Sequence, residues 1–224
     1  RTFFNHNVYS AAGATGLVVQ NNIDAAASFY GAKLNGGGTV SGNLFAQNSV
    51  SIYLENAATI QNNVITEAVS MPTQDYGWGI DTYKANSGTI NHNLITKMAS
   101  TGTSNMLGIK LNDITDSTGS YHFTGAVTNN IIYNWKNTGI DAATKGNGAA
   151  SVTIQNNQIQ VSATSSPTAM NQSSTAAQST FVYGGNIYSA TGQSSMNKVG
   201  STRESLSAWK IATAESNAVY GVAS

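Results

Sequence analysis

Three charged side chains recur at one place in a short repeated pattern and could do chemistry together. Each follows a glycine and an isoleucine, and the three are Asp81, Lys110 and Asp141. The lysine could abstract the proton alpha to the carboxylate of a uronic acid. Alternatively, the two aspartates could be the acid and base of an inverting glycosidase, whose carboxyl groups lie about 6.5–9.5 Å apart. Because charged residues are only 9% of the chain, this group is the clearest local sign of a site.

Alternation along a strand predicts where these three residues lie. The preceding isoleucine points into the core, so the charged residue points outward. If the strands lie side by side about 4.8 Å apart, Asp81 and Asp141 are roughly 10 Å apart with Lys110 between them. The same column is equally explained as a ladder of surface ion pairs, each worth about 0–1 kcal/mol. Catalysis and a structural role both stay open.

Aromatic residues gather near these strands. Three long segments, Glu67 to Trp78, Lys97 to Met106 and Asp113 to Gly125, are positioned to wall a groove over the charged column. Exposed aromatic rings beside polar groups are what sugar recognition needs. The expected substrate-binding residues are Tyr53, Tyr76, Trp78, Tyr83, Tyr121 and His122. The alternative is that Tyr76 and Trp78 only anchor a long loop.

A second repeat predicts the scaffold that positions them. It reads apolar, two polar or small residues, Asn, then two mostly apolar positions. The Asn occurs at Asn7, Asn22, Asn43, Asn63, Asn93, Asn130, Asn157 and Asn186. Its spacing varies while the pattern stays constant, which is typical of a solenoid with loops of different lengths. We expect the Asn to adopt the left-handed bend between strands and to hydrogen-bond from coil to coil. Ile60, Ile90, Val127 and Ile154 should then form one aliphatic stack.

These repeats resemble those of the right-handed parallel β-helix proteins of the pectate-lyase-like superfamily, over about residues 3 to 190. The resemblance implies an all-β, right-handed solenoid of about eight coils. It also implies an extracellular or cell-surface location and a polysaccharide or cell-surface glycan as partner. Many members use calcium, which is conceivable at Asp81 and Asp141, although Lys110 opposes it; no other cofactor is expected. Many lyases of the superfamily use an arginine beside the sugar carboxylate, whereas the only arginines here are Arg1 and Arg203.

The pattern changes after residue 200, so we expect a β-helix over 1–200 and a C-terminal cap over 201–224. Ser201 and Glu204 fit a capping box, followed by a short helix with Leu206, Trp209 and Ile211 on one face. The tail also resembles the Trp-containing segment that closes many secreted bacterial β-helix proteins, with Glu215 and Ser216 as the acidic residue and Ser after the Trp. The first residues enter the repeat at once, which favours a longer solenoid whose N-terminal remainder is a partner.

Composition excludes several classes of function. Ten basic and ten acidic residues give no net charge, which argues against a nucleic-acid surface. The absence of cysteine excludes disulfides and thiolate metal sites, and no His or carboxylate group has metal-site spacing. No apolar run approaches the roughly 18 residues of a membrane span. Two hypotheses therefore stand: a module that acts on polysaccharide as a lyase or glycosidase, and a non-catalytic glycan-binding or structural β-helix.

Overall fold

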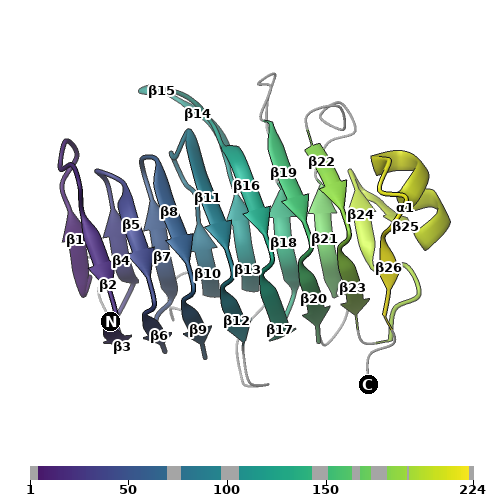
Figure 1. Cartoon of the computed structure of the whole chain (residues 1–224), viewed down its shortest axis with the longest axis horizontal. Helices are drawn as coiled ribbons and strands as arrows, with labels where there is room; N and C mark the ends of the chain where they lie inside the picture. The colour runs from purple at the N-terminus through teal and green to yellow at the C-terminus, as the bar shows by residue number, and fades with distance from the viewer. Residues whose placement is uncertain are drawn as a thin grey trace.

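The protein is a parallel β-helix (Figure 1). The computed structural model describes residues 5–69, 77–96, 106–142, 151–162, 167–172, 181–190 and 192–221. In these residues, strands from successive coils pair in parallel and build three long sheets, with one short helix at the C-terminal end. The expected all-β solenoid with a C-terminal helix is thus confirmed. No helix in the described part of the chain is long and apolar enough to cross a membrane.

Each of the first seven coils contributes one strand to each sheet, and the C-terminal end adds two strands to sheet A and one to sheet C. Sheet A contains β1 (Val8–Ser10), β4 (Tyr30–Leu34), β7 (Val50–Leu54), β10 (Gly77–Asp81), β13 (Met106–Leu111), β18 (Thr138–Ala142), β21 (Thr168–Gln172), β24 (Asn197–Val199) and β25 (Thr202–Glu204). Sheet B contains β2 (Val18–Gln20), β5 (Gly38–Ser41), β8 (Ala58–Gln61), β11 (Ser87–Asn91), β16 (Thr124–Thr128), β19 (Val152–Gln155) and β22 (Phe181–Gly184). Sheet C contains β3 (Ile23–Ala25), β6 (Leu44–Ala46), β9 (Val64–Thr66), β12 (Leu94–Thr96), β17 (Ile131–Trp135), β20 (Gln158–Val161), β23 (Ile187–Ala190) and β26 (Val219–Tyr220).

The repeated asparagines form a ladder inside the bend between sheets B and C. The side-chain oxygen of Asn93 accepts hydrogen bonds from the backbone N–H of Asn63 at 3.1 Å and from its amide at 3.0 Å. The Asn63 amide also donates to the Val40 carbonyl at 3.0 Å. The same contacts link Asn22, Asn43, Asn63, Asn93, Asn130, Asn157 and Asn186. Each rung therefore satisfies buried polar groups of its neighbours, as buried amides require.

Two details of the predicted ladder are wrong. The left-handed bend is made by the residue before the ladder Asn; Asn21, Asn62, His92, Asn129 and Asn156 have φ between 52° and 56°. Because the preceding residue makes the bend, the side chain of the ladder Asn points inward. Asn7 is not a rung, because it precedes β1 of sheet A and not a bend from B to C. Its amide donates instead to Asp24 Oδ1 at 2.9 Å and to the Ala25 carbonyl at 3.0 Å.

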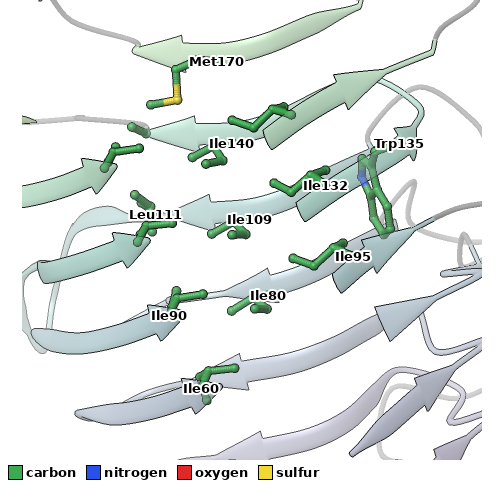
Figure 2. Close-up of a cluster of buried hydrophobic side chains, with 14 of the residues drawn as sticks. Ile60, Ile80, Ile90, Ile95, Ile109, Leu111, Ile132, Trp135, Ile140 and Met170 are labelled. Atoms are coloured by element: carbon green, nitrogen blue, oxygen red, sulfur yellow. The ribbon is translucent and has the colours of Figure 1, made fainter. Parts of the chain in front are cut away.

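The core consists of aliphatic stacks that run along the solenoid. Ile60, Ile90, Val127 and Ile154 pair in register in sheet B and are fully buried, as expected. Figure 2 shows a second stack from sheet A, in which Ile80, Ile109, Ile140 and Met170 follow one another. Each such side chain contributes about 1.5–3 kcal/mol by leaving water. The isoleucine that precedes each charged residue is thereby fixed inward.

The C-terminal end differs from the prediction in its details. Helix α1 (Leu206–Thr213) is capped by Ser205, whose side chain accepts a hydrogen bond from the Ala208 N–H at 3.3 Å. The capping box predicted at 201–204 is wrong, because Thr202–Glu204 pair with β24 as the antiparallel strand β25. Trp209 is fully buried, but Ile211 is 85% exposed. Residues two apart lie on nearly opposite sides of a helix, so these two cannot share a face.

Candidate functional site

The predicted charged column exists on the outer face of sheet A. Asp81 pairs in register with Tyr53 on one side and Lys110 on the other. Lys110 pairs in turn with Asp141, and Asp141 with Asn171. The strand spacing therefore places these side chains about 4.8 Å apart, one per coil. The structure thus brings together Asp81, Lys110 and Asp141 as the sequence predicted, and adds Asn171.

In the strands of sheet A, side chains do not alternate regularly between the core and the outer face. The irregularity lies at a position occupied by a small residue, Gly79 in β10. Trp78 and Ile80 are two residues apart, yet Trp78 packs in a cluster outside the sheet and Ile80 packs in the core. Gly79 lies between them, and a Cβ there would be 2.5 Å from the Gly108 carbonyl oxygen. Because Gly79 has no Cβ, its backbone can approach that of Gly108 closely. The irregularity places both Trp78 and Asp81 on the outer face.

An aromatic cluster covers the first half of this face. It consists of the buried side chains of Phe29, Tyr30, Val50, Tyr53, Trp78 and Leu107, with the partly buried Tyr83 packed against them. The ring centres of Tyr30 and Tyr53 are 4.3 Å apart, and those of Tyr53 and Tyr83 are 5.2 Å apart. The expectation of exposed rings is therefore wrong for Tyr53 and Trp78, which are only 6% and 7% exposed. Tyr53 stacks on Tyr30 and Tyr83 from the neighbouring coils, and Trp78 lies beneath the Lys110 ammonium, so both leave little ring face for a sugar.

Lys110 lies against this cluster. Its Nζ is 3.8 Å from the centre of the Trp78 ring, which is a close cation–π contact. Such contacts are worth about 0.5–2 kcal/mol, depending on how far water is excluded. Lys33 takes a similar place three strands earlier in sheet A, 5.6 Å from the Tyr30 ring and 3.6 Å from Glu55 Oε1. Both lysines therefore help to fix the aromatic cluster.

Asp81 is fully buried beneath these groups. Its Oδ1 accepts a hydrogen bond from the Asn112 amide, while its Oδ2 is buried without a hydrogen bond. Burial raises the pKa of Asp81 to about 7, although Lys110, Asn112 and the Tyr83 backbone N–H act in the opposite direction. Loss of water around a carboxylate disfavours its charged form, which explains the sign of this shift. Asp81 therefore exists in both protonation states near neutral pH.

The second half of the column is open to solvent. Lys110, Asp141, Asn171 and Lys198 are all partly exposed. The Asn171 amide donates a hydrogen bond to Asp141 Oδ1 at 2.7 Å. This part of the face therefore presents an ammonium group, a carboxylate and an amide on successive coils.

A hairpin beside the aromatic cluster carries the remaining predicted residues. Strands β14 (Asp113–Asp116) and β15 (Gly119–His122) pair between sheets A and B and project from the solenoid (Figure 1). Lys84 joins this hairpin to the coil before it, with Nζ 2.8 Å from Asp116 Oδ2 and 5.1 Å from the Tyr121 ring. The same lysine is 5.6 Å from the Tyr83 ring. Tyr121 thus lies near the predicted face, and His122 is partly buried on the same strand.

Some residues of the face were missed, and one predicted residue cannot be placed. Tyr76 lies outside the described residues. Sequence reasoning did not identify Asn112, Lys84 or Asp116. Asn112 is the last residue of the repeat that begins at Gly108, so the repeat includes it. Spacing alone does not show that its side chain contacts Asp81 of the previous coil.

A hollow of about 530 Å³ lies on the outer face of sheet B, away from the charged column, where Gly38, Ala58, Gly88 and Gly125 leave space beside a row of threonines. It contains no charged or aromatic side chain. No group of three or more histidine or carboxylate side chains in the described part of the chain could hold a metal ion. The structure does not test whether calcium, which the resemblance makes conceivable at Asp81 and Asp141, binds there.

Comparisons with models of protein families, with curated proteins and with solved structures give no match for this chain. The fold and the geometry of the outer face of sheet A are therefore the basis for a functional proposal.

Proposed function

We propose that this chain is a non-catalytic, extracellular glycan-binding β-helix. Its ligand would lie across the coils on the outer face of sheet A, over Lys110, Asp141 and Asn171. One observation carries the proposal: Asp81 is fully buried, whereas these three neighbours in the same column are partly exposed. The acid or base that a glycosidase would need at Asp81 is covered, while the groups that can hydrogen-bond a sugar are reachable.

The chemistry of the exposed groups suits a sugar. The Asn171 amide and the Asp141 carboxylate are already paired at 2.7 Å, so they are held in place before a ligand binds. Fixed amide, carboxylate and ammonium groups offer donors and acceptors to neighbouring hydroxyl groups of a pyranose. Preorganisation of this kind reduces the entropy lost on binding. Lys110 and Lys198 would also favour a glycan that carries carboxylates.

A specific observation favours catalysis as a second candidate. Asp81 has a pKa of about 7 and lies beside Lys110 in the column. Strongly shifted acids with a charged neighbour are common in active sites, because a proton donor works best near the ambient pH. As a glycosidase, this candidate requires a movement that exposes Asp81 to substrate. As a lyase, it would use the partly exposed Lys110 as the base.

Titration calorimetry with a panel of neutral and uronic polysaccharides tests the proposal. We expect one glycan class to bind the wild-type protein and to bind Asn171→Ala at least tenfold more weakly. Thr153→Ala, on the outer face of sheet B, is the matched control and should bind like the wild type. If no polysaccharide binds, or if both variants bind equally well, the proposal is wrong.

Assays for new reducing ends and for unsaturated uronic products distinguish the second candidate. The binding proposal predicts no products from any glycan that binds. Cleavage that is lost in Asp81→Asn, with binding retained, would establish the catalytic candidate instead.

A further inference from the structure

Lysines recur at every third strand of the column on the outer face of sheet A. Lys33 of β4, Lys110 of β13 and Lys198 of β24 are three strands apart along the solenoid (Figure 1). In register, the column runs Lys33, Tyr53, Asp81, Lys110, Asp141, Asn171 and Lys198. Because neighbouring strands lie about 4.8 Å apart, consecutive lysines of the column are roughly 14 Å apart.

Lys110 and Lys198 are the two lysines of this column without a carboxylate at ion-pair distance. Lys33 differs from them, because its Nζ is 3.6 Å from Glu55 Oε1. The only other ion pair between described residues belongs to the hairpin. Both Lys110 and Lys198 are partly exposed. Their ammonium groups are therefore open to an anionic group of a ligand.

The two positions between these lysines suit hydroxyl groups. The Asn171 amide donates a hydrogen bond to Asp141 Oδ1 at 2.7 Å, and both side chains are partly exposed. An ionised carboxylate only accepts hydrogen bonds, whereas an amide both donates and accepts, so a ligand hydroxyl can bond to either. A ligand carboxylate opposite Asp141 would instead place two acceptors of like charge together.

The column is closed at both ends of this stretch. Arg203 pairs in register with Lys198, but its guanidinium donates to the carbonyls of Pro167 and Ser195, each at 3.0 Å. On the other side of Lys110, Asp81 is fully buried. The accessible stretch therefore offers a cation, a carboxylate, an amide and a cation on four successive strands.

We infer that the glycan of the proposed function, on which this inference rests, is an extended and sparsely acidic chain that lies along the solenoid. It carries a carboxylate on every third sugar. Two of these carboxylates bind Lys110 and Lys198, and the two sugars between them present hydroxyl groups to the other positions. An extended 1,4-linked pyranose chain advances by about one strand spacing per sugar, so each sugar meets one coil.

The same four positions select against two other classes of glycan. A chain with a carboxylate on every sugar would place one of them against Asp141. A neutral chain would leave the ammonium groups of Lys110 and Lys198 without an anion. Selection between classes of glycan therefore depends on the spacing of charge, as complementary and repulsive contacts together set specificity.

Three polymers that share one backbone test this inference by titration calorimetry. They are polygalacturonate, the same polymer after partial reduction of its carboxyl groups to alcohols, and the fully reduced, neutral polymer. The partly reduced polymer should bind the wild-type protein at least fivefold more tightly than either of the others. Length and linkage are the same in all three, so a difference in affinity reports charge spacing alone.

Two variants test the roles of the charged residues. Lys198→Gln should weaken binding of the partly reduced polymer at least fivefold and leave the neutral polymer unaffected. Asp141→Asn removes the like charge and should strengthen binding of unreduced polygalacturonate at least fivefold. Lys210→Gln, in helix α1, makes the same change of net charge away from sheet A and should bind all three polymers like the wild type. Circular dichroism and thermal unfolding show whether each variant is folded.

Three results would overturn the inference: tighter binding of the neutral or the unreduced polymer by the wild type, a folded Lys198→Gln protein that binds like the wild type, or an Asp141→Asn protein without a gain for polygalacturonate. The proposed function stands in each of these cases if Asn171→Ala still weakens glycan binding. It also stands, and the inference is wrong, if none of the three polymers binds while another polysaccharide binds through Asn171. If no polysaccharide binds at all, both are wrong.

Discussion

Asn186 donates both its backbone N–H and its side-chain amide to Glu215 Oε1, at 3.0 and 2.7 Å. The other oxygen of Glu215 accepts hydrogen bonds from the Tyr188 hydroxyl at 2.9 Å and from Trp209 Nε1 at 2.8 Å. Glu215 thus takes the place that an Asn of the next coil would have, and it ties the ladder to the capping helix. The acidic residue that the sequence predicted after the Trp is therefore structural: Glu215 accepts the hydrogen bonds that close the ladder.

Glu215→Ala should strongly destabilise the protein. It leaves buried donors of Asn186, Tyr188 and Trp209 without an acceptor, and each unsatisfied buried group costs about 1–3 kcal/mol. We expect a loss of at least about 3 kcal/mol in the free energy of unfolding, measured by urea titration. Glu204→Ala is the control, because the contact that Glu204 makes with Tyr220 uses its backbone carbonyl. Equal effects of the two variants would contradict this account of the cap.

The ladder should be far more sensitive than the surface beside it. Asn63→Ala removes the acceptor of two bonds from Asn43 and the donor to Val40, all in a buried bend. We expect a loss of roughly 2–4 kcal/mol in unfolding free energy. Gln61→Ala, two residues earlier on the outer face of sheet B, should change it by less than about 0.5 kcal/mol. A ladder variant as stable as the surface variant would show that the amide bonds add nothing.

Gly108→Ala tests the irregular position of sheet A. A Cβ at this position would lie 2.5 Å from the Gly139 carbonyl oxygen, which is backbone and cannot turn away. We expect the free energy of unfolding to fall by more than about 2 kcal/mol. Glycan affinity should also fall, because Lys110 is two residues away. At Gly184, a Cβ would meet only the flexible side chain of Gln155, at 3.3 Å. Gly184→Ala should therefore be nearly neutral in thermal unfolding, and a comparable loss in both variants would count against the argument.

The sequence predicted what depends on repetition. The ladder from Asn22 to Asn186, the inward stack around Ile90 and the column of Asp81, Lys110 and Asp141 all follow from one pattern used many times. In a solenoid, equal positions of successive coils become neighbours, so spacing is enough to predict which residues pair.

Burial of the outer face could not be predicted in the same way. Periodicity shows that Asp81 points away from the core, but not that Phe29 and Tyr30, two coils earlier, help to build a second apolar cluster on that side. The same limit applies at the B–C bend. Both residues of the pair Asn62 and Asn63 suit a left-handed bend by type, and only the backbone shows that the first one adopts it.

The pH dependence of stability should report the burial of Asp81. Its pKa is about 7 in the folded protein, whereas the ordinary pKa of an aspartate is 3.8, so the folded state binds the proton more tightly. The stability from this group is therefore complete below about pH 4 and is lost as the pH rises through about 7, by up to about 4 kcal/mol. Asp81→Asn, which resembles the protonated acid, should remove this slope. Urea unfolding at pH 5 and pH 8 measures it.

Asp116 provides the opposite control for that experiment. Its hydrogen bonds with Lys84 and Thr118 lower the pKa of its carboxyl, so any stability it adds is lost as the pH falls. Asp116→Asn should therefore leave the decline between pH 5 and pH 8 unchanged, because this carboxyl stays ionised across that range. If Asp81→Asn keeps the full decline while Asp116→Asn removes it, the buried proton is not on Asp81. The raised pKa of Asp81 would then no longer support the catalytic candidate.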